Sequence, residues 1–143
     1  MADRILDEVM AQQIQAEIEQ FLANWQDHGK PIRSSLYRVH NAYFIIQAHE
    51  ERVDGCPIDE LYAFFKSLGI RYGIDFLDRF RVGYLDADGR LHITALHQLP
   101  QLYREGQISD ETLFYNHVAN TPEDLEQWLQ PLAKSWIRRF VHT

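Results

Sequence analysis

The stretch SSLYRVHNAYFIIQA, residues 34–48, decides the fold because it has the pattern of a β-hairpin. Two runs rich in β-branched and aromatic residues, 34–39 and 43–48, flank a short turn at Asn41. Asparagine tolerates the left-handed backbone conformation that tight turns require. Residues 44–46 are all apolar, so apolar side chains would lie on both faces of the strand. This favours a strand that is central in the sheet or covered on both faces.

Amphipathic helices are predicted on both sides of this hairpin. Before it, apolar residues at helical spacing predict a helix from about Leu6 to His28, which Gly29 ends. After it, Pro57 stands at a favoured first helical position, and residues 58–68 place apolar side chains on one helix face. The hairpin is thus flanked in the sequence by two predicted helices.

A second hairpin is predicted over residues 79–96, because two alternating apolar runs flank the turn residues DADG at 86–89. The same four residues resemble the opening of a calcium-binding loop. The glycine comes two positions early for such a loop, however, and the closing glutamate is missing. The hairpin interpretation is therefore favoured.

The C-terminal part of the chain is predicted to be mostly helical. A short helix is expected over residues 100–105, and residues 109–118 are ambiguous between a helix and an irregular segment. Thr121 is predicted to cap the last helix. The apolar stripe of that helix runs from Leu125 to Phe140, and Pro131 must kink the helix or restart it as two.

These elements follow the order α-β-β-α-β-β-α-α, which is typical of the α+β class. We expect one mainly antiparallel sheet of about four strands, formed by two hairpins joined through a helix, with the helices packed mostly on one face. A chain of 143 residues has the length of one domain, so residues 1–143 are predicted to form a single α+β domain.

The overall charge and composition exclude several classes of protein. A net charge of −7, from 14 basic and 21 acidic residues, argues against a nucleic-acid partner, which usually needs a basic patch. The single cysteine excludes an internal disulfide framework and a cysteine-rich zinc site. The N-terminus MADRILDE lacks the features of a signal peptide, and the longest apolar run, residues 42–46, is far shorter than the ~20 residues that span a bilayer. We therefore expect a cytoplasmic protein with no membrane partner.

The sequence also lacks the common motifs for nucleotides, metals and serine nucleophiles. It has no G-x-x-x-x-G-K-[ST], G-x-G-x-x-G or G-x-S-x-G pattern, which excludes nucleotide hydrolysis by a P-loop mechanism. The 7 histidines form no H-E-x-x-H pattern and no H-x-x-x-H pair on a convincing helix. We expect neither a cofactor nor a metal.

The lone cysteine, Cys56, precedes Pro57 at the predicted start of the second helix. A helix N-terminus favours the thiolate by about 0.3–1 kcal/mol. Asp54, Asp59 and Glu60 oppose this effect with comparable strength. The sequence therefore favours a structural cysteine, and the alternatives are a reactive thiol or a contact with a ligand.

Other polar residues lie among aromatic ones. The segment YGIDFLDRFRVGY, residues 72–84, places Asp78 and Arg79 between aromatic side chains, and Asn116 follows Tyr115. Such residues can line a cleft, but capping of the preceding helix and pairing with the backbone are favoured. The candidate pocket predicted from the sequence comprises Cys56, Asp59, Asp78, Arg79 and Asn116.

Four strings stand out along the chain, in the order WQDHG (25–29), GCPID (55–59), YGIDFLDRFRVGY (72–84) and SWIRRF (135–140). They resemble a family of small uncharacterised bacterial proteins whose members are often labelled "ABC transporter ATPase". That label does not fit a chain without a phosphate-binding loop. Members commonly read Gly-Cys-Ser-Ile-Asp at the second string, and they usually begin with an extra strand-like segment before the first helix. The resemblance implies a bacterial cytoplasmic protein and assigns no catalytic residue.

The function that these observations favour is a non-enzymatic binding or interaction module, because many aromatic residues accompany an acidic composition without a catalytic constellation. Its partner would be a protein or a small-molecule ligand. Self-association as a homodimer would cover the edges of a small sheet. The alternative is a small enzyme that uses Cys56 with Asp59 and a histidine, for which His49 is the nearest in sequence.

Overall fold

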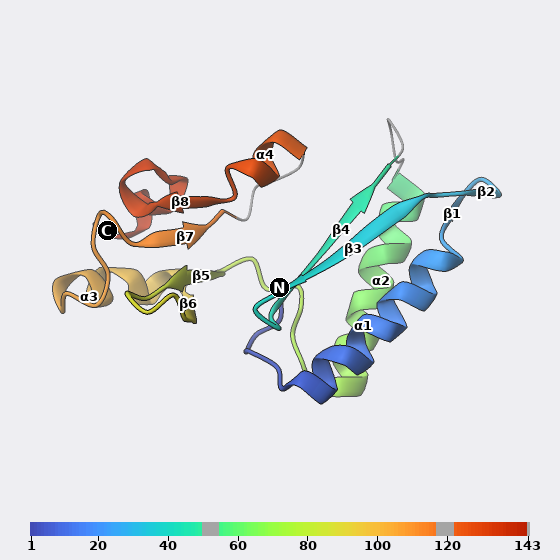
Figure 1. Ribbon diagram of the computed structural model, residues 1–143, viewed down its shortest axis with the longest axis horizontal. Helices are drawn as coiled ribbons and strands as arrows, with labels where there is room; N and C mark the ends of the chain where they lie inside the picture. Colours follow the sequence, from blue (N-terminus) through green and yellow to red (C-terminus); the bar gives the residue numbers. More distant parts are fainter. Residues whose placement is uncertain (50–54, 117–121, 143) are drawn as a thin grey trace. The chain divides into compact units, whose positions relative to one another are not determined.

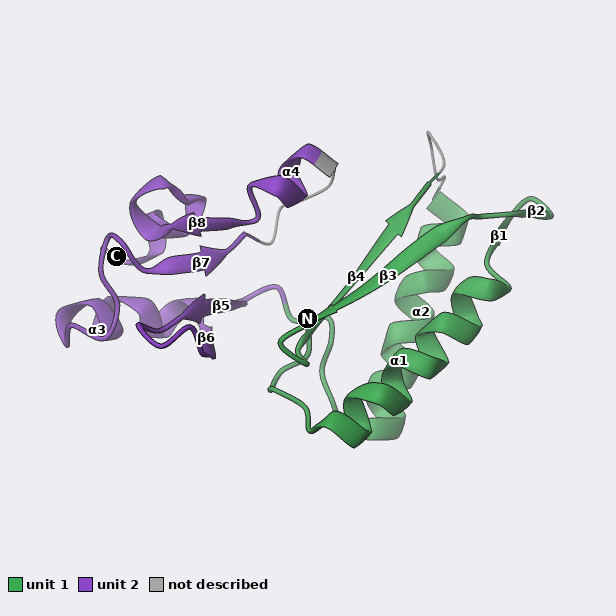
Figure 2. Ribbon diagram, in the orientation of Figure 1, with its two compact units in different colours: residues 1–78 green, residues 79–143 purple. Residues whose placement is uncertain are grey.

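A computed structural model describes residues 1–49, 55–116 and 122–142 of the chain. The chain divides into two compact units, Met1–Asp78 and Arg79–Thr143 (Figure 2). Both units combine helices with antiparallel strands, so the predicted α+β class is confirmed. This division into two units does not confirm the single domain predicted over residues 1–143, which stays a prediction.

Unit 1 is built from helices and hairpins (Figure 1). Its helices are α1 (Glu8–Ala23) and α2 (Gly55–Tyr72). The main hairpin pairs β3 (Ser34–Val39) with β4 (Tyr43–Ala48) in antiparallel register. His40 and Asn41 have positive φ angles of 55° and 53° in the turn between these strands. The hairpin predicted over residues 34–48 is therefore confirmed.

The first helix is shorter than the predicted range from Leu6 to His28. It starts after Asp7, whose carboxylate accepts the Met10 N–H at 2.8 Å, and it ends at Ala23. The residues that follow form a minimal hairpin of β1 (Gln26–Asp27) and β2 (Lys30–Pro31). His28 and Gly29 have φ angles of 51° and 81°, as a two-residue hairpin turn requires. Gly29 therefore makes this turn and does not end the helix.

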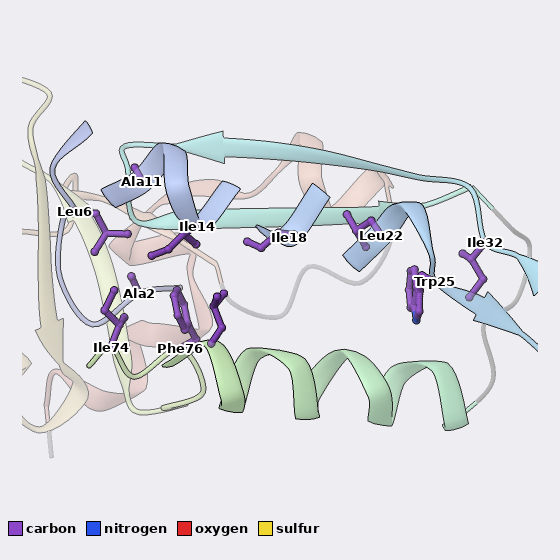
Figure 3. Packing of buried hydrophobic residues seen from close by; sticks show 11 residues of the cluster. Ala2, Leu6, Ala11, Ile14, Ile18, Leu22, Trp25, Ile32, Ile74 and Phe76 are labelled. Carbon is purple, nitrogen blue, oxygen red and sulfur yellow. The ribbon is translucent and has the colours of Figure 1, made fainter. Parts of the chain in front are cut away.

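The two helices of unit 1 run antiparallel and are held together along their length. The Phe21 and Phe64 rings stack with centroids 4.4 Å apart. At one end of the helix pair, Trp25 Nε1 donates to the backbone oxygen of Pro57 at 3.0 Å. Figure 3 shows the buried side chains that fill the space shared by the helices and the main hairpin. They are Ala2, Leu6, Ala11, Ile14, Ile18, Leu22, Trp25, Ile32, Leu68, Ile74 and Phe76.

Unit 2 contains an antiparallel sheet whose strand order is β6-β5-β7-β8. The strands are β5 (Arg81–Leu85), β6 (Leu91–Ala95), β7 (Leu113–Tyr115) and β8 (Leu129–Pro131). The second predicted hairpin is confirmed as β5–β6. Its turn is held by Asp86, whose Oδ1 accepts the N–H groups of Asp88 at 2.8 Å and Arg90 at 3.0 Å. The hairpin interpretation of DADG is therefore correct.

The strand arrangement differs from the expected single sheet of two hairpins. Among the described residues, β3–β4 forms a sheet of its own, and β5–β6 gains β7 and β8 as neighbours. Strand β7 comes from the segment that was ambiguous in the sequence, and β8 from the stripe predicted to be helical. The reason is that short apolar runs suit strands as well as helices, and pairing partners decide between them.

The last predicted helix does not continue along its apolar stripe from Leu125 to Phe140. The helix α4 (Pro122–Glu126) is short, and the strand β8 follows it. Ser135, whose Oγ accepts the Ile137 N–H at 3.1 Å, starts a new turn after Pro131. The predicted cap Thr121 lies outside the described residues. The remaining helices are α3 (Leu99–Arg104), which agrees with the predicted short helix, and the 3-10 helices η1 (Leu96–Gln98), η2 (Leu132–Lys134) and η3 (Trp136–Phe140).

We predict that Gly69→Ala destabilises the protein by about 1–3 kcal/mol, because overpacking of a tight contact has this cost. A Cβ at position 69 would lie 2.3 Å from the Ile74 backbone oxygen, and the Ile74 N–H donates to the Gly69 oxygen at 2.9 Å. Urea unfolding followed by circular dichroism measures the change. The matched control is Gly55→Ala on the same helix, where nothing lies within 4 Å and stability should hold or rise. Equal stability of the two variants would contradict the close contact.

We further predict that Glu17 links stability to pH. Its carboxylate accepts hydrogen bonds from the Tyr72 hydroxyl and the Arg71 guanidinium, which lower its pKa from the ordinary 4.5. A lowered pKa stabilises the fold above that ordinary value, and the contribution is lost as the pH falls through the lowered pKa. Glu17→Gln should therefore reduce the free energy of unfolding by up to about 1 kcal/mol at pH 7 and by less at acidic pH. Urea unfolding at pH 7 and at acidic pH measures the loss of stability, and Glu19→Gln at an exposed position of the same helix is the control. A loss of stability in Glu17→Gln that grows toward low pH would contradict the prediction.

Candidate functional site

The cysteine that the sequence singled out lies on the first turn of α2. Cys56 and Asp59 are both exposed there. The nearest histidine in sequence, His49, shares a hydrogen bond with Ser35, whose Oγ lies 2.6 Å from its Nε2. Within the described part of the chain, the Cys56 thiol has no hydrogen-bonding or ionic partner. A base that would activate this thiol is therefore not among its described contacts.

The other predicted pocket residues are spread over the two units. Asp78 is the last residue of unit 1, and Arg79 is the first residue of unit 2. Asn116 belongs to unit 2, where its Oδ1 accepts the Trp136 indole N–H at 2.6 Å and its own N–H donates to the Trp128 oxygen at 2.7 Å. These bonds agree with the structural role that the sequence favoured for Asn116. One pocket formed by all five predicted residues stays a prediction.

A cavity of about 250 Å³ lies elsewhere in unit 1, between β4 and α2. We call it the β4–α2 pocket. It is bounded by the strand, by the middle of the helix, by the segment that follows the helix, and by Met1 at the N-terminus. Its lining residues are Met1, Phe44, Ile46, Leu61, Tyr62, Phe65, Phe76 and Leu77.

Local structure explains why these side chains meet. Phe44 and Ile46 are two apart on β4 and therefore share one face of the strand. Leu61 and Phe65 are four apart on α2 and share one face of the helix. The chain then returns beside the helix because Gly69 allows the Ile74 backbone to approach closely.

Aromatic rings form the walls of the pocket. The Phe76 ring meets the Phe65 ring edge to face, with centroids 5.5 Å apart. It meets the Phe44 ring in the same way at 6.2 Å. Phe76 is buried, whereas Tyr62 and Leu77 are 52% and 39% exposed at the rim. The floor is therefore fixed by packing, and the rim is open to a partner.

The chemistry of this lining suits burial of an apolar group. The Tyr62 hydroxyl is the one titratable side-chain group among its residues. No cluster of three or more histidine, cysteine or acidic side chains that could hold a metal occurs in the described residues. Across residues 1–49, 55–116 and 122–142, every helix is too short or too polar to cross a bilayer.

A second cavity, of about 240 Å³, lies within unit 2. It brings together Tyr103, Asp110, Arg138 and His142 from distant parts of the sequence. The Tyr103 hydroxyl donates to Asp110 Oδ1 at 3.0 Å, and this bond raises the pKa of Tyr103. The His142 ring stands edge to face with the Tyr103 ring, with centroids 5.1 Å apart. The polar side chains of this second cavity thus contact one another within unit 2, as in a network that stabilises the fold.

The sequence does not predict the β4–α2 pocket from its polar and nucleophilic residues, because none of those predicted for a site lines it. One signal for it was present. The apolar face of α2 includes Tyr62 and Phe64 beside Leu61 and Phe65. This face is wider than the stripe that a helix needs to pack against one neighbouring element.

No family model, curated protein or solved structure matches this chain. The resemblance to the small bacterial proteins labelled "ABC transporter ATPase" therefore stays a prediction. A function has to follow from the chemistry of the chain's own residues.

We predict that Cys56→Ser changes the free energy of unfolding by less than about 0.5 kcal/mol, as expected for an exposed side chain without partners. Binding to the β4–α2 pocket should also be unchanged, since Cys56 is not among its lining residues. Urea unfolding and the binding titration described below measure the two quantities. The matched substitution Ser67→Cys, at another exposed position of α2, should accept a thiol reagent at the same rate as Cys56. Much faster alkylation of Cys56 would favour the enzyme alternative.

Proposed function

We propose that this chain is a non-enzymatic binding module whose binding site is the β4–α2 pocket. The single observation that supports this proposal is the lining: apolar and aromatic side chains from four segments converge on one open cavity, with one hydroxyl among them. Binding pockets are mostly apolar and carry few polar groups. A cytoplasmic location, expected from the sequence, is part of the same proposal.

The size of the cavity limits what it can hold. A dry cavity of about 150 Å³ accepts a benzene molecule. The β4–α2 pocket, at about 250 Å³, therefore has room for a bicyclic ring or a large apolar side chain. The edges of the Phe65 and Phe76 rings would meet such a ring in the geometry that aromatic pairs favour. The Tyr62 hydroxyl at the rim can accept or donate one hydrogen bond.

We predict that indole, a neutral bicyclic probe, binds the wild-type protein with a dissociation constant of about 0.1–3 mM, as expected for a ligand of this size. Titration followed by amide NMR should shift the resonances of Ile46, Leu61 and Phe65. Tyr62→Ala removes part of the rim and should weaken binding about threefold or more. The free energy of unfolding of the Tyr62→Ala variant should differ little from that of the wild type, because Tyr62 is half exposed.

The matched control is Tyr37→Ala on β3. Tyr37 is 49% exposed, close to the 52% of Tyr62, but it does not line the pocket. Its removal should leave indole affinity unchanged. Equal loss in both variants, or shifts confined to unit 2, would reject the β4–α2 pocket as the binding site.

A further inference from the structure

The two helices of unit 1 are unequally covered. Helix α1 buries residues along most of its length, whereas α2 buries residues only near its two ends. The buried residues are Ala11, Ile14, Ile18 and Leu22 on α1, and Pro57, Leu68 and Gly69 on α2. The central turns of α2, which carry Leu61 and Phe65, are only partly buried.

The width of the hairpin explains this difference. Packed helices lie about 8–10 Å apart, whereas neighbouring strands lie about 4.8 Å apart. Two strands therefore cover roughly one of the two helices. Strand β3 contacts α1, and the pocket opens where β4 ends the sheet above α2. Room for a further strand thus lies beside β4.

The free edge of β4 can be assigned from the backbone hydrogen bonds. In an antiparallel pair, alternate residues direct their N–H and C=O toward the partner strand. The His49 N–H donates to the Arg33 oxygen at 2.8 Å, so odd-numbered residues of β4 face β3. Phe44, Ile46 and Ala48 therefore direct their N–H and C=O to the opposite edge. In the described part of the chain, no strand pairs with that edge along β4. The N-terminal segment reaches only its start, where the Ala2 N–H donates to the Ala42 oxygen at 2.7 Å.

The same residues connect the edge to the pocket. Phe44 and Ile46, which present their backbone groups at the free edge, also line the pocket with their side chains. A strand added antiparallel to β4 would place alternate side chains on the same face, directly above Leu61 and Phe65. One extended segment could therefore satisfy the backbone and fill the pocket together.

We propose that β4 and α2 form a peptide-binding groove, in which an extended segment of a partner protein adds as a third strand antiparallel to β4. This inference rests on the proposed function and names the class of its partner. The segment carries apolar side chains at alternate positions, which enter the β4–α2 pocket. The opposite side chains face solvent.

The charge around the groove specifies the flanks of this segment. Asp59 lies one turn before Tyr62 on α2, and Asp78 directly follows Leu77 after the helix. Lys66 is the basic residue one turn after Tyr62. Acidic residues also outnumber basic ones across unit 1. A segment with basic residues at its ends therefore complements this rim.

A second copy of the chain fits the same edge less well. Pairing of β4 with β4 of a copy would bring two α2 helices and two acidic rims to one side of the joined sheet. Helices need about twice the spacing of strands, so the copies would compete for the space beside the edge. The geometry therefore favours a slender segment over a second folded unit.

The test uses the full chain and the peptide Lys-Val-Thr-Val-Thr-Val-Lys, acetylated and amidated at its ends. We expect it to bind and to shift the amide resonances of Phe44, Ile46 and Ala48. N-methylation of the central Val removes a donor that faces β4, and should weaken binding at least about tenfold. N-methylation of a Thr, whose N–H faces solvent in this register, should leave the affinity nearly unchanged. A peptide with Glu in place of both Lys should bind more weakly, and added salt should reduce the difference.

A substitution in the protein tests the free edge of β4 independently of the peptide variants. Ala48→Pro removes an outward N–H and blocks an added strand, while proline is tolerated where the N–H makes no ladder bond. Ser34→Pro makes the matched change at the outer edge of β3 and should not affect peptide binding. Indole should still bind the Ala48→Pro variant, since Ala48 does not line the pocket.

The outcomes separate this inference from the proposed function. Indole binding at the pocket without any peptide binding would overturn strand addition and leave the pocket assignment in place. Peptide binding that is weakened equally by both N-methylations would also overturn strand addition, because only side chains would then be recognised. A stable dimer that Ala48→Pro dissociates would show that a second copy occupies the edge and would overturn the peptide proposal. Failure of both probes would reject the pocket itself.

Discussion

A two-stranded hairpin is too narrow to cover two packed helices, and this constraint shapes unit 1. The strand β3 covers α1, whose Ile14 and Ile18 are fully buried. Aromatic side chains then fill as much of the remaining space as they can reach. Phe64 stacks on Phe21 on one side of α2, and Phe65 meets Phe76 on the other. The β4–α2 pocket is the space that they leave.

The sequence predicted the parts of the fold that depend on local patterns. Both hairpins lie within their predicted ranges, because alternation along each strand and the turn residues between the strands indicate the same structure. The first helix was predicted too long because the apolar spacing continues to Trp25. That side chain is buried, but it lies beyond Ala23, where the helix ends. The stripe from Leu125 to Phe140 failed for a related reason: helical spacing cannot show that pairing with β7 is available to residues 129–131.

The candidate site was less predictable than the fold. The pocket depends on Gly69, which lets the chain turn back and carry Phe76 to β4, and no spacing rule links those positions. The polar residues that the sequence places among aromatic ones make structural hydrogen bonds instead. Asn116 pairs with two tryptophans, and Asp75 accepts the Leu77 N–H at 2.9 Å. Residue chemistry thus identified polar residues with structural hydrogen bonds, whereas the pocket arises from apolar residues that only the tertiary structure brings together.

The edges of the β3–β4 sheet differ in a way that bears on how the groove is used. Natural proteins protect edge strands with charged residues, proline or a cover, because unpaired backbone groups invite other strands. On β3, Arg38 occupies an outward position, and its guanidinium donates to Glu8 of α1 at 2.8 Å. The sequence of β4, YFIIQA, contains neither a charge nor a proline. An edge without these protections, placed beside an apolar pocket, has what strand addition needs: backbone groups that bind any extended chain, and a cavity that selects among its side chains.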